Sequence, residues 1–144
     1  MATEVNLKKA TFKHIESELY SYKDTLKEID RIRAEIMSGT RNEIDENVGG
    51  NSKTSPIPGR PTERIATRLL THKTLRNLEE IASAIEVTFN KMSKDHQSVI
   101  RVKYWGKQKV TWDDVAVQTN MHRNTAMKLR KDFVVEIADK IGWR

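Results

Sequence analysis

The chain has 144 residues, the size of one domain or of a small domain with an appendage. It contains no cysteine, which excludes disulfides and thiolate metal sites, and its many charged residues with few Gly and Pro favour an all-α fold. The net charge of +6 lies entirely in the last 54 residues, which contain 12 Lys or Arg and 6 Asp or Glu. Such a concentration of positive charge indicates a polyanionic partner, of which nucleic acid is the first candidate.

A heptad-like pattern predicts a first long amphipathic helix over residues 11–37. Thr11 is its expected N-cap, and apolar residues then recur three, four or seven positions apart, with an interruption at Arg33. These apolar residues are Ile15, Leu19, Tyr22, Leu26, Ile29 and Ile36. Gly39 is the expected end of the helix. Residues 39–60 are rich in Gly and Pro, so we expect them to form a long linker loop.

A second long amphipathic helix is predicted over residues 61–92. Pro61 suits its first position, and its apolar stripe again follows spacings of three and four. The stripe consists of Ile65, Leu69, Leu70, Leu75, Leu78, Ile81, Ile85, Phe89 and Met92. The two long helices would pack either within one chain or in a homodimer, and the pattern does not decide between them. Together they define a helical N-terminal region, residues 1–92.

Three shorter helices are predicted in residues 93–144. Ser93 is a good N-cap for a helix over 94–104, and residues 105–109 form a turn. Thr111 with Asp114 reads as a capping box that starts a second, short helix. The last helix runs to about Lys140 and is stopped by Gly142.

The spacing of small and apolar residues around Asn120 is typical of a helix-turn-helix. Ala116 is small enough for two helices to touch, and Asn120 tolerates the left-handed conformation that the turn requires. Met121 follows as the apolar residue after the turn, and Ala126 and Leu129 would face inward. Because all these positions match, we interpret residues 93–144 as a DNA-binding domain. An ordinary helical pair with an Asn turn meets part of the same pattern and is kept as the alternative.

In a helix-turn-helix the second helix enters the major groove with its N-terminal part facing the bases. Arg binds guanine through two hydrogen bonds, Asn binds adenine, and Met or the Thr methyl group contacts the methyl group of thymine. The base-facing candidates are Arg123, Asn124, Thr125, Met127 and Lys128. The phosphate-binding candidates are Lys107, Lys109, Thr111, Trp112, Arg130 and Lys131, with Thr111 and Trp112 acting through backbone amides at a helix start. Each residue alone would also suit a solvated surface.

No pattern in the chain indicates catalysis, a metal or a cofactor. The four histidines show no metal-ligand spacing, and Asp113 with Asp114 point to different faces of a helix. There is no P-loop and no nucleophile motif. The N-terminus lacks a signal-peptide core, and no apolar run approaches the length of a membrane span. We expect a non-enzymatic cytoplasmic protein that does not contact the membrane.

Two stretches of the sequence resemble known families. Residues 91–133, KMSKDHQSVIRVKYWGKQKVTWDDVAVQTNMHRNTAMKLRKDF, resemble region 4 of bacterial sigma factors, which binds the −35 element of a promoter. Nearly the whole chain resembles the phage late-gene transcriptional regulators of the RinA/ArpU type. Their first helix ends near an RxEI motif, here residues 33–36, and an NxGG loop follows, here residues 47–50.

The resemblance implies sequence-specific binding of double-stranded promoter DNA in the bacterial host cell. It also implies activation of late genes for packaging and morphogenesis, and leaves contact with host RNA polymerase as an open question. Two residues depart from the sigma pattern: His122 stands where Ser or Thr usually caps the recognition helix, and Met127 stands where Arg is usual. These departures bear on the target sequence and not on DNA binding itself.

Two other functions fit the same pattern. A small terminase-like DNA-packaging subunit also joins a helix-turn-helix to oligomerising helices, and its ring would be recognised by its mass in solution. A helical adaptor would bind protein through the stripes of 11–37 and 61–92, and its basic end would then show no salt-sensitive DNA binding.

Overall fold

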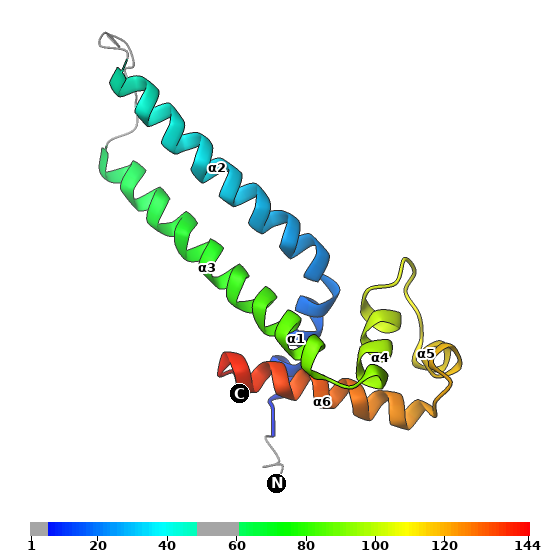
Figure 1. Ribbon diagram of the computed structural model, residues 1–144. Helices are drawn as coiled ribbons and strands as arrows, with labels where there is room; N and C mark the ends of the chain where they lie inside the picture. Colours follow the sequence, from blue (N-terminus) through cyan, green and yellow to red (C-terminus); the bar gives the residue numbers. More distant parts are fainter. Residues whose placement is uncertain (1–5, 49–60) are drawn as a thin grey trace. The chain divides into compact units, whose positions relative to one another are not determined.

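The computed structural model describes residues 6–48 and 61–144, and every regular element in these ranges is an α-helix (Figure 1). The all-α class expected from the sequence is therefore confirmed. The helices are α1 (Lys9–Tyr20), α2 (Tyr22–Val48), α3 (Pro61–Lys91), α4 (Lys94–Tyr104), α5 (Trp112–Thr119) and α6 (Arg123–Ile141). Residues 49–60 of the expected linker lie outside the described ranges. No helix in the described residues is long and apolar enough to cross a membrane.

The prediction of a single helix over residues 11–37 is wrong at the start, the middle and the end of that range. The helix begins at Lys9, and the hydroxyl of Thr11 donates to the backbone carbonyl of Arg144 instead of capping the helix. It breaks at Ser21, and beside this break the indole nitrogen of Trp105 donates to the carbonyl of Leu19 at 3.0 Å. It continues through Gly39, since one helical Gly costs only about 1 kcal/mol against Ala.

The break at Ser21 also changes which residues of α2 face inward. Ile32 is 4% exposed and Thr25 is 8% exposed, whereas Leu26, expected in the seam, is 39% exposed. The inward positions therefore follow an unbroken heptad spacing of three and four. They are Tyr22, Thr25, Ile29, Ile32 and Ile36.

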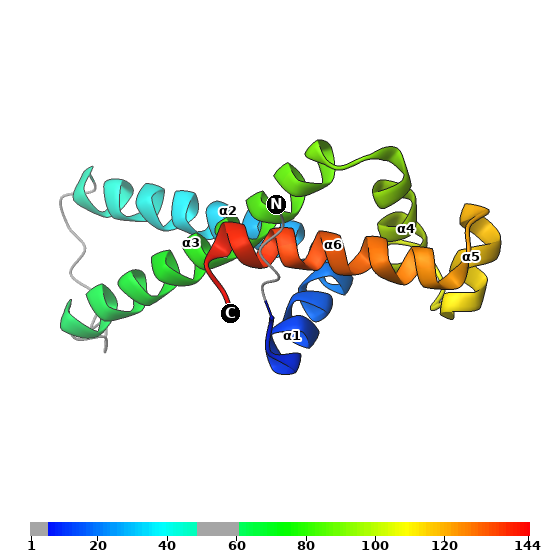
Figure 2. The same cartoon turned by 90° about the horizontal axis from the view of Figure 1, so that it is seen from below.

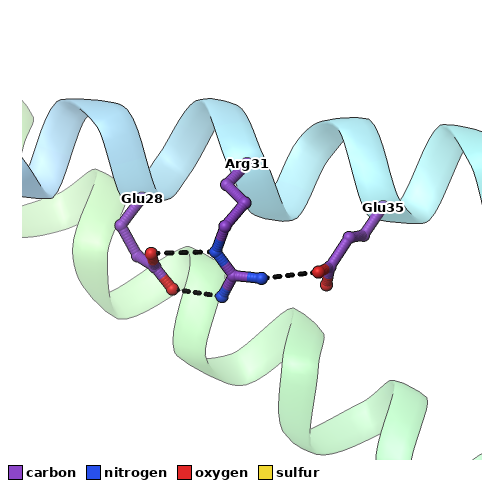
Figure 3. A network of polar contacts seen from close by, with 3 residues as sticks. All are labelled: Glu28, Arg31 and Glu35. Atoms are coloured by element: carbon purple, nitrogen blue, oxygen red, sulfur yellow. Dashed lines mark hydrogen bonds and ion pairs between the residues drawn. The ribbon is translucent and has the colours of Figure 1, made fainter.

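Residues Thr25–Glu79 form one compact unit that contains most of α2 and the first part of α3. The two helices run side by side in opposite directions (Figures 1 and 2), and the guanidinium of Arg33 pairs with the carboxylate of Glu79 at 2.8 Å. On the outer face of α2, Arg31 lies between Glu28 and Glu35 and bonds to both (Figure 3). Four large apolar side chains of this unit are more than half exposed: Met37, Ile65, Leu69 and Leu70.

The second compact unit combines residues up to Asp24 with Glu80–Arg144. Its main core draws buried side chains from α1, the end of α3, α4 and α6, and α1 packs against α6 (Figure 2). The core residues are Ile15, Leu19, Ala84, Ile85, Ile100, Tyr104, Phe133, Val134, Ile137 and Ala138. Each of the larger ones stabilises the fold by about 1.5–3 kcal/mol through burial. The C-terminal helices thus share one core with the first helix of the chain.

Three expected helix ends are confirmed. Pro61 is the first residue of α3, and the hydroxyl of Ser93 accepts the backbone N–H of His96 at the start of α4. Gly142 ends α6 with a φ of 84°, a left-handed conformation that Gly adopts at low cost. The chain then folds back, and Trp143 packs against the main core.

Candidate DNA-binding site

The turn between α5 and α6 is built by local hydrogen bonds. Asn120 has φ 56° and ψ 43°, the left-handed conformation expected for it. The N–H of Met121 donates to the carbonyl of Ala116 at 3.0 Å, and the N–H of Asn120 donates to that of Val117 at 3.3 Å. This pair of bonds is the Schellman motif, which satisfies the last carbonyls of a helix. The direction in which the chain leaves α5 is therefore fixed.

Both helices of the pair are capped at their N-termini. Thr111 and Asp114 bond reciprocally, side chain to backbone N–H, so the expected capping box is confirmed. At the start of α6 the ring nitrogen Nδ1 of His122 accepts the N–H of Asn124 at 3.1 Å. An imidazole thus supplies the cap that Ser or Thr usually supplies, and the departure at residue 122 leaves the helix start intact.

A small apolar cluster holds α4, α5 and α6 together. Val99, Val115 and Ala126, one from each helix, are all fully buried. Met121 and Leu129 pack around them, in the inward positions expected from the sequence. This packing fixes which side of α6 faces away from the protein.

The outward side of α6 carries the candidates expected to face the bases. Arg123, Asn124, Thr125 and Lys128 are exposed, and Met127 is half-buried. Positions three and four apart on a helix are neighbours on its surface, and each of these side chains has such a neighbour in the set, so together they form one surface. Lys131 is exposed as well and lies one turn further along.

Two carboxylates lie beside this surface at the start of α5. Asp113 is 3.7 Å from the guanidinium of Arg123, and both side chains are more than half exposed, so water screens the pair and its contribution is small. The N–H of Thr111 already donates to Asp114. A phosphate at the amides of Thr111 and Trp112 would meet these two negative charges, which argues against the contact expected there.

Arg130 lies apart from the exposed set. Its guanidinium is packed between the rings of Phe12 and Trp112, 4.9 and 4.7 Å from their centres, and its side chain is only 15% exposed. Nη1 donates to the carboxylate of Glu16 in α1 at 3.1 Å. This environment could not be predicted from local patterns, because Glu16 is 114 positions away and Arg130 lies at the margin of an amphipathic pattern.

Lys107 and Lys109 are exposed in the segment between α4 and α5. Lys107 also lines a shallow hollow of about 490 Å³, together with Arg101, Gly106 and Gln118. Lys103, by contrast, turns inward: its amine donates to the carbonyl of Val110 at 2.7 Å, and burial lowers its pKa. Lys107 and Lys109 are therefore the free cations of this segment that could meet a polyanion.

His96 and His122 have structural partners. Besides the cap formed by His122, the ring of His96 lies 2.6 Å from the hydroxyl of Ser93 and 3.4 Å from Asp132. Within the described residues no group of three or more His, Asp and Glu could hold a metal ion.

Comparison with known proteins places the chain in a family. Residues 12–139 match the family described as "Protein of unknown function (DUF722)". The chain belongs to this family. This DUF722 chain is also 27% identical, over 136 residues that make up 94% of each chain, to the transcriptional activator RinA of Staphylococcus phage phi11. The resemblance to regulators of the RinA type is thereby confirmed. No solved structure matches the chain at a significant level.

Proposed function

We propose that this DUF722 protein is a sequence-specific DNA-binding transcriptional activator of phage late genes for packaging and morphogenesis. It acts on double-stranded promoter DNA in the cytoplasm of the bacterial host, with host RNA polymerase as a further partner. The observation that carries the proposal is the exposed face of α6, where Arg123, Asn124 and Lys128 follow directly after the turn at Asn120. The activator role is supported by the name of the phage phi11 relative.

In this proposal α5, the Asn120 turn and α6 are a helix-turn-helix, and the first turns of α6 enter the major groove. Arg123 binds a guanine and Asn124 an adenine, while Thr125 and Met127 contact thymine methyl groups and Lys128 contacts a base edge. Lys107, Lys109 and Lys131 bind phosphates and supply salt-sensitive affinity. We leave Arg130 out of the phosphate set because its guanidinium has partners inside the protein. Thr111 and Trp112 are left out because carboxylates flank them.

The roles of two exposed α6 residues give the test. The full-length protein is used to select duplexes from a random library, and the affinities of the selected and scrambled duplexes are then compared. Replacing Asn124 with Ala should relax the preference at one position, at a cost of about 1–3 kcal/mol for the preferred base. Replacing Lys131 with Ala should weaken all duplexes alike and lower the salt slope by about one. If both variants change every duplex equally, or if no sequence is selected, the proposal is wrong.

One observation favours a second candidate function, that of a protein-binding adaptor. Met37, Ile65, Leu69 and Leu70 expose apolar surface on the unit Thr25–Glu79, whereas a single-chain hairpin would be expected to bury such side chains. An adaptor would bind its protein partner unchanged after Asn124→Ala and Lys131→Ala, and would select no DNA sequence. The same library selection therefore separates the two functions.

A further inference from the structure

The carboxylate of Glu16 connects three helices of the unit that contains α6. One oxygen, Oε2, accepts both the hydroxyl of Tyr104 in α4 at 2.6 Å and Nη1 of Arg130 in α6 at 3.1 Å. The side chains of Glu16 and Arg130 are 21% and 15% exposed. A part-buried charged pair of this kind is less screened by water than a fully exposed pair.

The aromatic rings around Arg130 restrict it further. Its guanidinium lies against Phe12 of α1 on one contact and against Trp112 of α5 on another. Side chains from α1 and α5 therefore contact Arg130 directly, and Tyr104 of α4 is linked to it through Glu16. Arg130 is three positions from Met127 and two from Lys128 on the same helix. A rotation of α6 that moved its outward face would therefore also move Arg130 away from the side chains that contact it.

Stability alone does not explain the charged pair. Nε of Arg130 is buried and has no hydrogen-bond partner within the described residues. An ion pair withdrawn from most of its water, with an unsatisfied donor, contributes little net stability, and an apolar side chain of similar volume often does as well or better. A charged network of this kind can instead select one arrangement of the packed helices.

We propose that Arg130 is a positioning residue of the DNA-binding surface and that Glu16 of α1 holds it, so that the first helix of the chain is part of the DNA-reading unit. This rests on the function proposed above. Arg130 touches no DNA in this proposal; it sets the rotation and depth at which α6 presents Asn124 and Arg123. Its loss should reduce discrimination between sequences, while the loss of a phosphate contact would weaken all sequences alike.

The test compares two charge-neutral double variants of the full-length chain. Glu16→Gln with Arg130→Met keeps an acceptor for Tyr104 and fills the space between the rings, but removes the ion pair. Lys91→Gln with Glu136→Gln is the matched control, because it removes another ion pair to α6, 3.3 Å long and exposed. For each, the affinities for a duplex selected by the wild type and for a scrambled duplex are measured, together with the thermal unfolding midpoint.

In the first variant the ratio of the affinities for the selected and the scrambled duplex should fall about tenfold, which is the size typical of coupling within one network. Its thermal unfolding midpoint should stay close to that of the wild type. The control should keep the ratio. An unchanged ratio in the first variant, or equal weakening on both duplexes, overturns the inference while leaving the proposed function intact. If the wild type selects no sequence, the proposed function fails and the inference falls with it.

Hydrogen exchange on the wild type covers the case in which the variant does not fold. Binding of the selected duplex should slow amide exchange in α1 around Phe12 and Glu16 more than binding of the scrambled duplex does. Identical exchange in α1 with both duplexes would overturn the role given to Glu16.

Discussion

The indole nitrogen of Trp105 donates a hydrogen bond to the backbone carbonyl of Leu19 at 3.0 Å, across 86 positions of the chain. The same ring stacks against Tyr22 and contacts Phe89, so the segment after α4 is anchored to the end of α1 and the end of α3. The turn after α4 is thus held by residues from near the other end of the chain.

Replacing Trp105 with Phe should lower the free energy of unfolding by about 0.5–1.5 kcal/mol beyond the loss of ring volume, because the hydrogen bond from the indole to the carbonyl of Leu19 is lost. Urea unfolding measures the change. Trp143→Phe is the matched control, since it makes the same change in volume at a ring that packs against His14. Equal losses in the two variants would show that the hydrogen bond contributes nothing.

The left-handed backbone conformation of Asn120 should make the stability of the protein respond differently to Gly and to Ala at this position. Asn120→Gly should leave the stability nearly unchanged, whereas Asn120→Ala should cost about 1 kcal/mol or more, since a Cβ is unfavourable at a φ of 56°. Thermal unfolding of both variants gives the comparison. If Ala is tolerated as well as Gly, the turn is not held in the left-handed conformation.

A fragment of residues 93–144 should not unfold cooperatively when it is studied alone. It lacks Ile15, Leu19 and Ile85, so the core faces of α4 and α6 would be exposed to water. Adding a peptide of residues 6–24 to a fragment of residues 80–144 should restore a cooperative transition, seen by circular dichroism. A cooperative transition of 93–144 by itself, with a midpoint like that of the whole chain, would contradict the shared core.

The tyrosines predict a loss of stability in alkali. Burial raises the pKa of Tyr20, Tyr22 and Tyr104 above the ordinary value, and for Tyr104 the bond to the Glu16 carboxylate adds to the effect. Above a pH of about 10 the unfolded chain loses tyrosine protons that the folded chain keeps, so the free energy of unfolding falls as the pH rises.

The measurement is urea unfolding between a pH of about 9 and about 11. Tyr104→Phe should flatten the dependence most, because Tyr104 is the most deeply buried of the three tyrosines, and Tyr20→Phe should flatten it less. If the free energy of unfolding depends on pH equally in the wild type and in Tyr104→Phe, the ionisation of Tyr104 does not contribute to the loss of stability.

The departure at residue 127 predicts a change of DNA preference. Met127→Arg restores the side chain usual in sigma factors at a half-buried position on the outward face of α6. Selected duplexes should then gain a guanine at one position, because Arg binds its O6 and N7 together. Met37→Arg adds the same charge on α2 and should leave the selected sequence unchanged. The same sequence logo for Met127→Arg and the wild type would exclude residue 127 from the interface.

Local chemistry explains what the sequence could predict. Five predicted helix boundaries depend only on residues within four positions of each other, and all five agree with the structure. They are the helix starts at Pro61, Ser93 and Thr111 and the helix ends at Asn120 and Gly142. The inward set of α5 and α6 follows from the same short spacings.

The errors depend on distant partners. The break at Ser21 lies beside Leu19, to which Trp105 bonds from 86 positions away, and it changes the register that the apolar spacing alone suggested for α2. Arg130 was expected on DNA because an arginine at the edge of a basic face has no local mark of burial. Its place is set by Glu16 and Phe12, which only the folded chain brings near.

The order in which the core is assembled has a consequence during protein synthesis. The ribosome releases α1 first and α6 last, and at typical rates of 5–20 residues per second roughly 5–25 s separate the two. Until Phe133 and Ile137 emerge, Ile15 and Leu19 lack the partners that bury them. We expect nascent chains stalled before Phe133 to remain sensitive to protease and those released after Trp143 to resist it, so that a prematurely terminated product is degraded.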